Sequence, residues 1–183
     1  WHLLNILTVL IFINDSPLYQ FPFNLLFIIL VTKCKKIWLV ENKIIKIING
    51  DNLPKEVDVN CCSVVIRKMQ EVLNDFKGVD IIITKGFGSG SGLGSSSASS
   101  AAAAYGYNKL IGSPFTTKEL ITFAAEGERV ACGSAHIDNV APSILGGIVL
   151  ATGKKPTDLI ELPLIDNLYA ITLFPRIKVN TSD

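Results

Sequence analysis

The pattern of apolar and polar positions becomes regular from Ile37 onward and predicts a mixture of strands and helices. Short apolar runs are interpreted as strands at residues 37–40, 44–48, 79–84, 148–151, 158–162 and 168–174. Helical spacing predicts a helix at residues 58–76, and further helices are predicted at the alanine-rich residues 97–110, at residues 117–131 and at the short apolar run 140–145. Thr116 and Glu119 form a capping-box signature before the third of these helices. Gly78 is predicted to end the first helix, and residues 41–43 are predicted to join the first two strands.

Residues 1–40 read differently from the rest of the chain. Apolar runs at residues 3–13 and 21–31 are separated by polar residues and a proline at positions 14–17. Each run is shorter than the roughly 20 apolar residues that a membrane span needs, and no basic start or small-residue cleavage site is evident. We therefore expect an atypical apolar segment at 1–40, which is core strand or helix, a targeting remnant or sequence foreign to the native protein, and one domain at 41–183.

Composition excludes several classes of function. The chain is 49% hydrophobic and 18% charged, with a formal net charge of +1, so it has the apolar content to bury a core and is not disordered. Because basic residues are scattered and nearly balanced by acidic ones, a nucleic-acid partner is not expected. The four cysteines include the adjacent pair Cys61 and Cys62 but no CxxC motif, so we predict buried small hydrophobes in a reducing compartment and no zinc site.

A glycine- and serine-rich loop lies between the predicted strand 79–84 and the alanine-rich helix 97–110. Glycines let the backbone approach an anion closely, and the first turn of a helix offers N–H groups and a partial positive charge. The loop matches neither the GxxxxGK[ST] phosphate loop nor the GxGxxG dinucleotide motif, and a flexible linker is the alternative. The predicted phosphate site comprises Gly88, Gly90, Ser91, Gly92, Leu93, Gly94, Ser95, Ser96 and Ser97.

A second group of polar residues follows the third predicted helix. A carboxylate of Glu126 or Glu128 can hold Mg²⁺ against phosphates, and His136, Asp138 and Asn139 can recognise the charged ends and hydroxyl of an amino acid. Taken singly, each residue has a simpler interpretation. The glutamates suit a solvated helix face, His136 suits a surface or capping position, and Asp138 suits the cap of helix 140–145.

Two strings resemble a known family. Residues 90–96 match the G-x-G-L-G-S-S core of the GHMP kinases, although that family usually has proline at the position of Gly88. Residues 133–142, Gly-Ser-Ala-His-Ile-Asp-Asn-Val-Ala-Pro, with Gly146 and Gly147 soon after, resemble the homoserine kinase branch in particular. The resemblance covers about residues 41–183 and does not extend to residues 1–40.

The resemblance implies both a fold and a reaction. The fold is the two-layer α+β (α/β two-layer) N-terminal domain of GHMP kinases, like domain 2 of ribosomal protein S5, with the ferredoxin-like C-terminal domain missing. The reaction transfers the γ-phosphoryl of ATP to the hydroxyl of L-homoserine, with Mg²⁺. Ser96 and Glu128 fall on the metal-holding positions, and His136, Asp138 and Asn139 fall on the homoserine-binding loop. Asn139 stands where other branches have an aspartate base, which implies direct attack by the substrate hydroxyl.

Two other readings stay open from the sequence: a GHMP kinase for another small molecule such as mevalonate, and a non-catalytic nucleotide-binding remnant. The chain begins at Trp1, stops at Asp183 and lacks the P-A-T-x-A-N-x-G-x-G-F-D string that the family usually carries, so we expect a fragment with little kinase activity. We expect a cytoplasmic protein, with a plastid as the alternative compartment, no membrane partner, and a homodimer left open.

Overall fold

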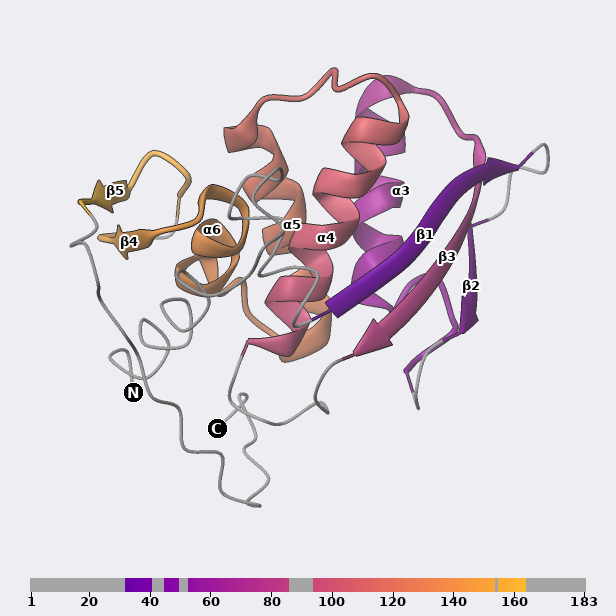
Figure 1. Ribbon diagram of the computed structural model, residues 1–183, viewed down its shortest axis with the longest axis horizontal. Helices are drawn as coiled ribbons and strands as arrows, with labels where there is room; N and C mark the ends of the chain where they lie inside the picture. The colour runs from indigo at the N-terminus through magenta and orange to yellow at the C-terminus, as the bar shows by residue number, and fades with distance from the viewer. Residues whose placement is uncertain (1–31, 41–44, 50–52, 86–93, 154, 164–183) are drawn as a thin grey trace, which may run out of the picture.

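The computed structural model describes residues 32–40, 45–49, 53–85, 94–153 and 155–163, and it contains both strands and helices (Figure 1). The predicted mixed α+β class is confirmed. The predicted strand at 168–174 and the apolar runs at 3–13 and 21–31 lie outside the described residues. The elements are β1 (Thr32–Val40), β2 (Ile45–Asn49), α3 (Cys61–Leu73), β3 (Gly78–Lys85), α4 (Ser95–Leu110), α5 (Thr117–Cys132), α6 (Ile137–Leu145), β4 (Ile148–Ala151) and β5 (Leu159–Leu162).

Three strands form the main sheet in the order β1-β3-β2. β1 runs antiparallel to β3, whereas β2 runs parallel to it. The strands predicted at 37–40 and 44–48 are therefore not paired with each other, because β3 lies between them. β1 also begins five residues before the predicted start, at Thr32. The parallel pair arises because α3 carries the chain from β2 back to the start of β3, as a crossover requires.

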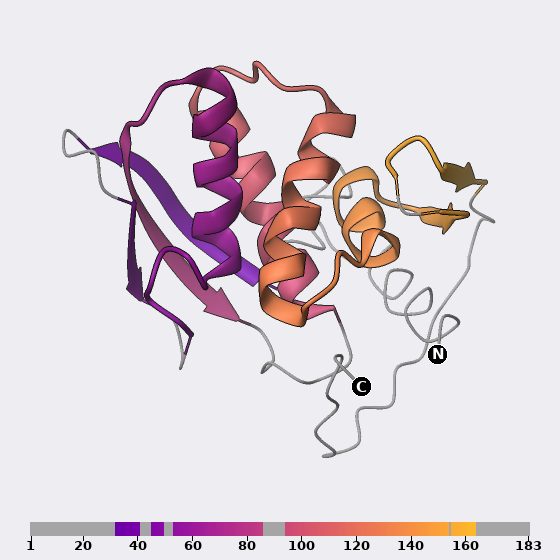
Figure 2. The ribbon, with the colours of Figure 1, turned by 180° about the vertical axis from the view of Figure 1, so that it is seen from behind.

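The core lies between this sheet and the helices. In β3, alternate side chains at Val79, Ile81 and Ile83 are buried, which is the period of two expected of a strand with one covered face. On α3, Val65 and Met69 are fully buried at helical spacing. Figure 2 shows the helices stacked beside the sheet and the β4–β5 ribbon at the far end of the molecule. The result is a two-layer arrangement in which the sheet covers one side of the helices.

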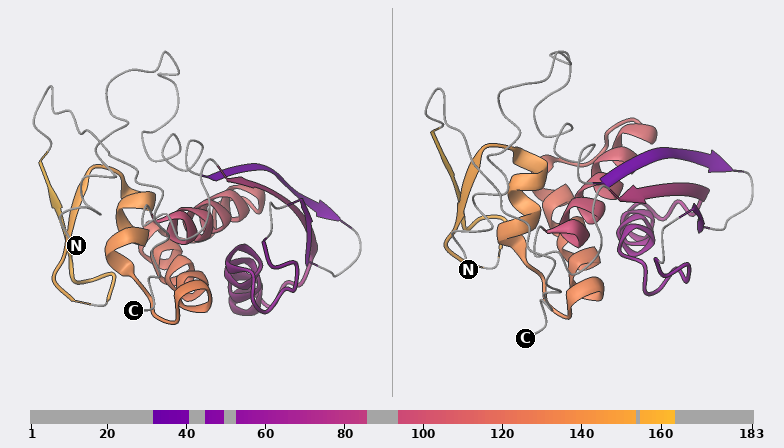
Figure 3. Two further views of the ribbon diagram at one scale, coloured as in Figure 1. Left: turned by 90° about the horizontal axis from the view of Figure 1, so that it is seen from below. Right: turned by 60° about the horizontal axis from the view of Figure 1, so that its bottom comes forward.

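α4 is the central helix, in contact with α3, α5, α6 and β1 (Figure 3). It is buried almost all round, which suits its sequence of small alanine and serine side chains. Small side chains let neighbouring helices approach closely, and alanine favours the helix itself. The predicted helix began at residue 97, but α4 begins at Ser95, so three serines fall within its first turn.

The end of α3 differs from the prediction. α3 stops at Leu73, where Asn74 adopts a left-handed conformation (φ 50°, ψ 37°) and its N–H bonds to the carbonyls of Gln70 and Glu71. The prediction that Gly78 ends this helix was wrong, since Gly78 is the first residue of β3. Asparagine tolerates the left-handed region better than most residues, so it serves as the cap in place of glycine. Among the described residues, no helix combines the length and apolar composition that crossing a bilayer requires.

Candidate functional site

The predicted phosphate loop is only partly described. Gly88, Gly90, Ser91, Gly92 and Leu93 lie outside the described residues, whereas Gly94, Ser95, Ser96 and Ser97 lie within them. β3 ends at Lys85 and α4 begins at Ser95, so the predicted strand–loop–helix order is confirmed at both ends. The chain therefore enters α4 at its N-terminus, where the helix dipole is positive.

Gly94 sets the start of α4. Its backbone is left-handed (φ 67°, ψ 33°), a conformation that glycine adopts without the steric cost of a Cβ. Its carbonyl accepts the first helical hydrogen bond, from the N–H of Ala98 at 2.9 Å. Within the described part of the chain, no side chain forms a capping hydrogen bond at this helix start. The helix therefore begins with a backbone suited to contact a ligand.

The first-turn serines lie in different environments. The Oγ of Ser97 is buried and has no hydrogen-bond partner within the described residues. Ser96 is half-buried, and its Oγ lies 3.4 Å from the Sγ of Cys132 at the last residue of α5. The start of α4 and the end of α5 are thus in direct contact through Ser96.

Glu128 lies on α5, one helical turn before Cys132, with only 2% of its surface exposed. Its Oε2 is buried and has no hydrogen-bond partner in the part of the chain that the structure describes. Glu126, by contrast, is partly exposed and pairs with Arg129 at 3.3 Å. Of the two candidate carboxylates, Glu126 is the surface residue and Glu128 is the buried one. A buried carboxylate oxygen without a partner costs free energy, so it marks a place where a cation or donor belongs.

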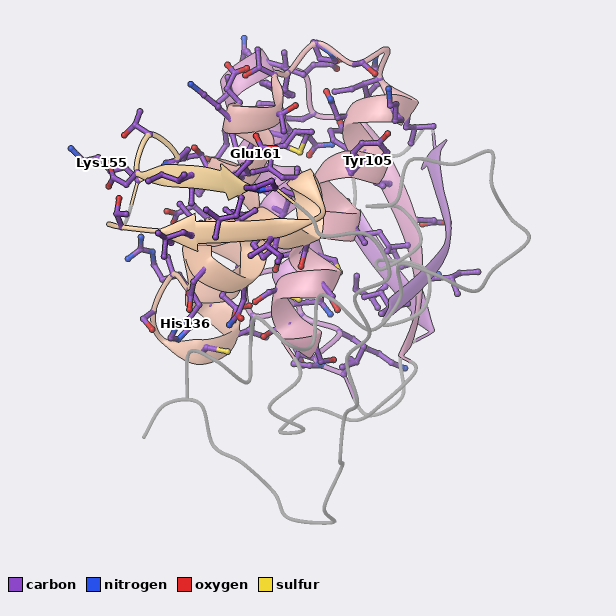
Figure 4. All side chains as sticks on the ribbon, turned by 60° about the vertical axis from the view of Figure 1, so that its left-hand side comes forward. Tyr105, His136, Lys155 and Glu161 are labelled. Atoms are coloured by element: carbon purple, nitrogen blue, oxygen red, sulfur yellow. The ribbon has the colours of Figure 1, made fainter. Side chains whose placement is uncertain are left out.

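The His-x-Asp-Asn segment is helical sooner than predicted. Residues 134–139 were predicted to precede the helix, but α6 begins at Ile137, with His136 as its N-cap residue and Asp138 and Asn139 in its first turn. Asp138 is therefore not the cap residue. The ring Nε2 of His136 and the Oγ of Ser134 are 2.9 Å apart, so that short bond fixes the ring. Figure 4 shows His136 at the lower end of the helices, whereas Tyr105 of α4 lies toward the other end.

Asn139 lies directly beside the start of α4. A Cβ built on Gly94 would lie 3.9 Å from the side-chain Cγ of Asn139. Three helix ends therefore meet at one place: the start of α4, the end of α5 and the start of α6. The proximity of Gly94 to Asn139 and the contact between Ser96 and Cys132 join segments that the sequence predicted as separate candidates.

Cys132 is the site residue that the sequence interpretation missed. The prediction of buried small hydrophobes holds for Cys62, which is fully buried, but Cys61 and Cys132 are half-buried, and Cys132 touches Ser96. Its position four residues after Glu128 was the available signal, because residues four apart share one face of a helix.

The site offers few protein ligands for a metal. Among the described residues, no three His, Cys, Asp or Glu side chains gather closely enough to hold one. A hydroxyl and a carboxylate near a phosphate-binding helix start suit Mg²⁺, which usually keeps waters and takes further oxygens from phosphates. The residues present therefore fit a metal that arrives with a nucleotide.

Comparison with known proteins places this site in a family. The sequence profile of the family described as GHMP kinases N terminal domain matches residues 59–147, which contain α3, β3, α4, α5 and α6. The homoserine kinase of Chlorobium phaeobacteroides is 44% identical over 146 residues, which cover 73% of this chain and 44% of that protein. The chain thus spans less than half the length of the relatives it matches.

Solved structures agree with this assignment. The crystal structure of homoserine kinase from Cytophaga hutchinsonii superposes with a TM-score of 0.68 at 43% identity, covering 72% of this chain and 43% of that one. The mevalonate kinase of Methanococcus jannaschii superposes with a TM-score of 0.56 at 16% identity, which shows a shared fold only. On the matched domain, the relatives and the superposed fold, the chain belongs to the GHMP kinase family.

Proposed function

We propose that this chain is the ATP-binding part of a homoserine kinase, which transfers the γ-phosphoryl group of ATP to the side-chain hydroxyl of L-homoserine. The observation that carries the proposal is the buried Oε2 of Glu128, which has no hydrogen-bond partner among the described residues and lies beside the junction of three helix ends. The names of the relatives at 43–44% identity supply the acceptor. The product, O-phospho-L-homoserine, would feed threonine synthesis, in the cytoplasm or a plastid.

The start of α4 would hold the phosphates. Backbone N–H groups in the first turn of α4, at Ser95–Ser97, would face the anion along the helix axis, and the helix dipole would add to their attraction. Ser96 and Glu128 would hold Mg²⁺, which when bound neutralises the charge on the β- and γ-phosphates. Ser96 is half-buried and Glu128 is buried, so both oxygens are shielded from bulk water. Electrostatic attraction is stronger in such a low-dielectric environment than in water.

The start of α6 would hold the acceptor. Asn139 lies against Gly94, so a hydroxyl that its amide orients would stand close to the phosphates. An amide does not take up a proton at neutral pH, so Asn139 would align the hydroxyl and not act as its base. His136 and Asp138, on the same helix start, would contact the charged ends of the amino acid. Catalysis of this kind relies on alignment and charge neutralisation.

The acceptor distinguishes this proposal from its nearest alternative, a mevalonate-type kinase. The likeness to the solved mevalonate kinase is at 16% identity and carries only the fold, whereas the homoserine kinases match at 43–44%. A panel of acceptors offered to the chain with Mg²⁺ and ATP tests this point. We expect homoserine to be preferred, and phosphorylation of mevalonate with refusal of homoserine would overturn the assignment.

Calorimetric titration with ATP, with and without Mg²⁺, tests nucleotide binding separately from turnover. We expect Mg²⁺ to tighten ATP binding by the wild-type chain, and Glu128→Gln to lose about tenfold or more of that gain. Glu126→Gln is the matched control, because it changes a surface carboxylate on the same helix and should leave both affinities unchanged. Equal losses in the two variants would contradict the assigned role of Glu128. Binding with little turnover is the expected result for this chain by itself, whereas turnover of homoserine at a normal kinase rate would overturn that expectation and exclude the alternative of a non-catalytic nucleotide-binding remnant.

A further inference from the structure

A close approach at Gly127, the residue before Glu128, fixes α5 against α3 and α4. A Cβ added to Gly127 would lie 2.6 Å from Cγ2 of Val65, 2.7 Å from the carbonyl oxygen of Cys61 and 2.7 Å from Oγ of Ser100. Real Cβ contacts are essentially never shorter than 3.0 Å, so only the missing side chain admits this approach. The position of α5 along α4 is therefore set by tight packing.

A second contact between α4 and α5 lies one helical turn further along each helix, where Ser96 meets Cys132. Ser96 precedes Ser100 by four residues on α4, and Cys132 follows Glu128 by four residues on α5. Residues four apart share one face of a helix, so the thiol lies on the Glu128 face of α5. The Sγ of Cys132 and the Oγ of Ser96 are 3.4 Å apart, a distance at which either atom can donate a hydrogen bond.

The buried carboxylate on the same face of α5 indicates that a ligand binds nearby. Glu128 is 2% exposed, and its Oε2 has no hydrogen-bond partner among the described residues, so a cation or a donor is needed there. Ser96 and Glu128 are the two side chains to which we assign Mg²⁺. Cys132 contacts the first of them and lies one helical turn from the second, so its thiol is placed to act on the hydroxyl of Ser96.

The chemistry of a serine hydroxyl defines what the thiol can do. The hydroxyl has one hydrogen and two lone pairs, and its hydrogen rotates about the C–O bond. When the oxygen faces a cation, the hydrogen must point away from that cation, and a sulfur atom can accept it. We propose that Cys132 is a positioning residue for Ser96: its sulfur accepts the hydroxyl hydrogen and leaves the lone pairs of the oxygen free to face the metal. This role rests on the proposed function, which makes nucleotide-bound Mg²⁺ the ligand of Ser96.

Mg²⁺-dependent ATP binding, followed by calorimetric titration, gives the first readout. We expect Cys132→Ala to lose about threefold of the gain that Mg²⁺ brings, as loss of one weak hydrogen bond does, with metal-free ATP affinity unchanged. Cys132→Ser should keep more of the gain than Cys132→Ala, because its hydroxyl also accepts a hydrogen bond. Cys61→Ala is the matched control, because it removes another half-buried thiol, from α3, and should keep the full gain.

A Ser96→Ala background shows whether the effect passes through Ser96. In that background Cys132→Ala should cause no further loss, and a further loss would contradict the positioning role. A full Mg²⁺ gain in Cys132→Ala, or equal losses in Cys132→Ala and Cys132→Ser, would overturn the positioning role while leaving the proposed function intact. If the wild-type chain shows no Mg²⁺ gain, or Ser96→Ala keeps it, the metal role of Ser96 fails and the role of Cys132 fails with it.

The infrared S–H stretching band gives a second readout, one that a merely structural role would not move. This band lies apart from those of other protein groups and shifts with hydrogen bonding, and the difference between wild type and Cys132→Ser isolates the Cys132 thiol. Without nucleotide, Ser96→Ala should shift the band, because it removes the oxygen that lies 3.4 Å from Sγ. Mg·ATP should shift it in the wild-type chain, whereas metal-free ATP should not. An unchanged band in either experiment, or an equal shift with metal-free ATP, would overturn the positioning role.

Discussion

The starts of α4 and α5 differ in how they treat the first-turn N–H groups, which have no partner within a helix. The first turn of α5 is closed by its own chain: Thr116 Oγ1 accepts from the N–H of Glu119 at 3.4 Å, and the Glu119 carboxylate accepts from the N–H of Thr116 at 2.7 Å. α4 starts at a left-handed glycine, and among the described residues no side chain caps it. A first turn that its own side chains cap stabilises the fold, whereas a first turn that no described side chain caps suits an anion, because helix N-termini attract negative charge.

Gly94→Ala should have the largest effect of the variants proposed, because it changes the backbone at the start of α4. An alanine held at φ 67° costs on the order of 1–2 kcal/mol, so the first turn of α4 is expected to shift and ATP affinity to fall about tenfold or more. The new Cβ would meet Asn139 only at ordinary contact distance, so the effect would come from the backbone. Titration with ATP measures it.

Gly112→Ala is the control for this variant. Gly112 also has a positive φ, of 90°, with nothing within 4 Å of an added Cβ, but it lies in the turn at the other end of α4. We expect it to lower stability to a similar extent and to leave ATP affinity unchanged. Equal loss of affinity in both variants would mean that the start of α4 has no special role.

Ser96→Ala should have the next largest effect, and only when Mg²⁺ is present. Removing one hydroxyl ligand is expected to lower Mg·ATP affinity about tenfold, as a lost hydrogen bond to a charged group does. Affinity for metal-free ATP serves as the internal control and should stay the same. The same loss with and without Mg²⁺ would show that Ser96 contacts phosphate and not the metal.

Thr116→Ala should affect stability and not ATP binding, which is the opposite of the effect expected for Ser96→Ala. Loss of the N-cap side chain is expected to lower the free energy of unfolding by about 1 kcal/mol, while ATP affinity stays unchanged. Urea denaturation measures the first and titration the second. Thr122→Ala is the matched control, because among the described residues its hydroxyl bonds only to the Lys118 carbonyl within α5, at 3.1 Å, and such back-bonding adds little to helix stability. A fall in ATP affinity on Thr116→Ala would contradict the separation of the two roles.

The sequence predicted the α5 start well because the signal is local. Thr116 and Glu119 are three residues apart, and the pattern alone specifies the capping box that the structure shows. The starts of α4 and α6 were placed two and three residues late. A run of serines after glycines reads as loop until the backbone of Gly94 is known, and His136 caps α6 without a side-chain hydrogen bond that a pattern would reveal.

The meeting of the helix ends was beyond the reach of local patterns. The pattern could not choose between Glu126 and Glu128, because burial depends on how α5 packs against α4, and only the family resemblance pointed to Glu128. The proximity of Gly94 to Asn139 depends on the tertiary arrangement of α4 and α6. The close approach at Gly127 likewise depends on three helices at once. Such features follow from packing that a single-sequence pattern does not encode.

The smallest expected effect is the pH dependence of the α5 cap. The hydrogen bond from the Thr116 side chain, and then the one from its backbone N–H, lower the pKa of Glu119 below its ordinary value of 4.5. A carboxyl whose pKa is lower in the folded state stabilises the fold above pH 4.5, and that contribution is lost as the pH falls below 4.5 and through the folded-state pKa. Wild-type stability should therefore decline more steeply below about pH 4.5 than that of Glu119→Gln, whose amide does not titrate, when both are followed by urea denaturation. Thr116→Ala should flatten the same part of the curve because it removes the largest cause of the shift. Parallel curves in all three proteins would show that the capping box does not respond to pH, and that its contribution to the α5 start does not depend on the charge of Glu119.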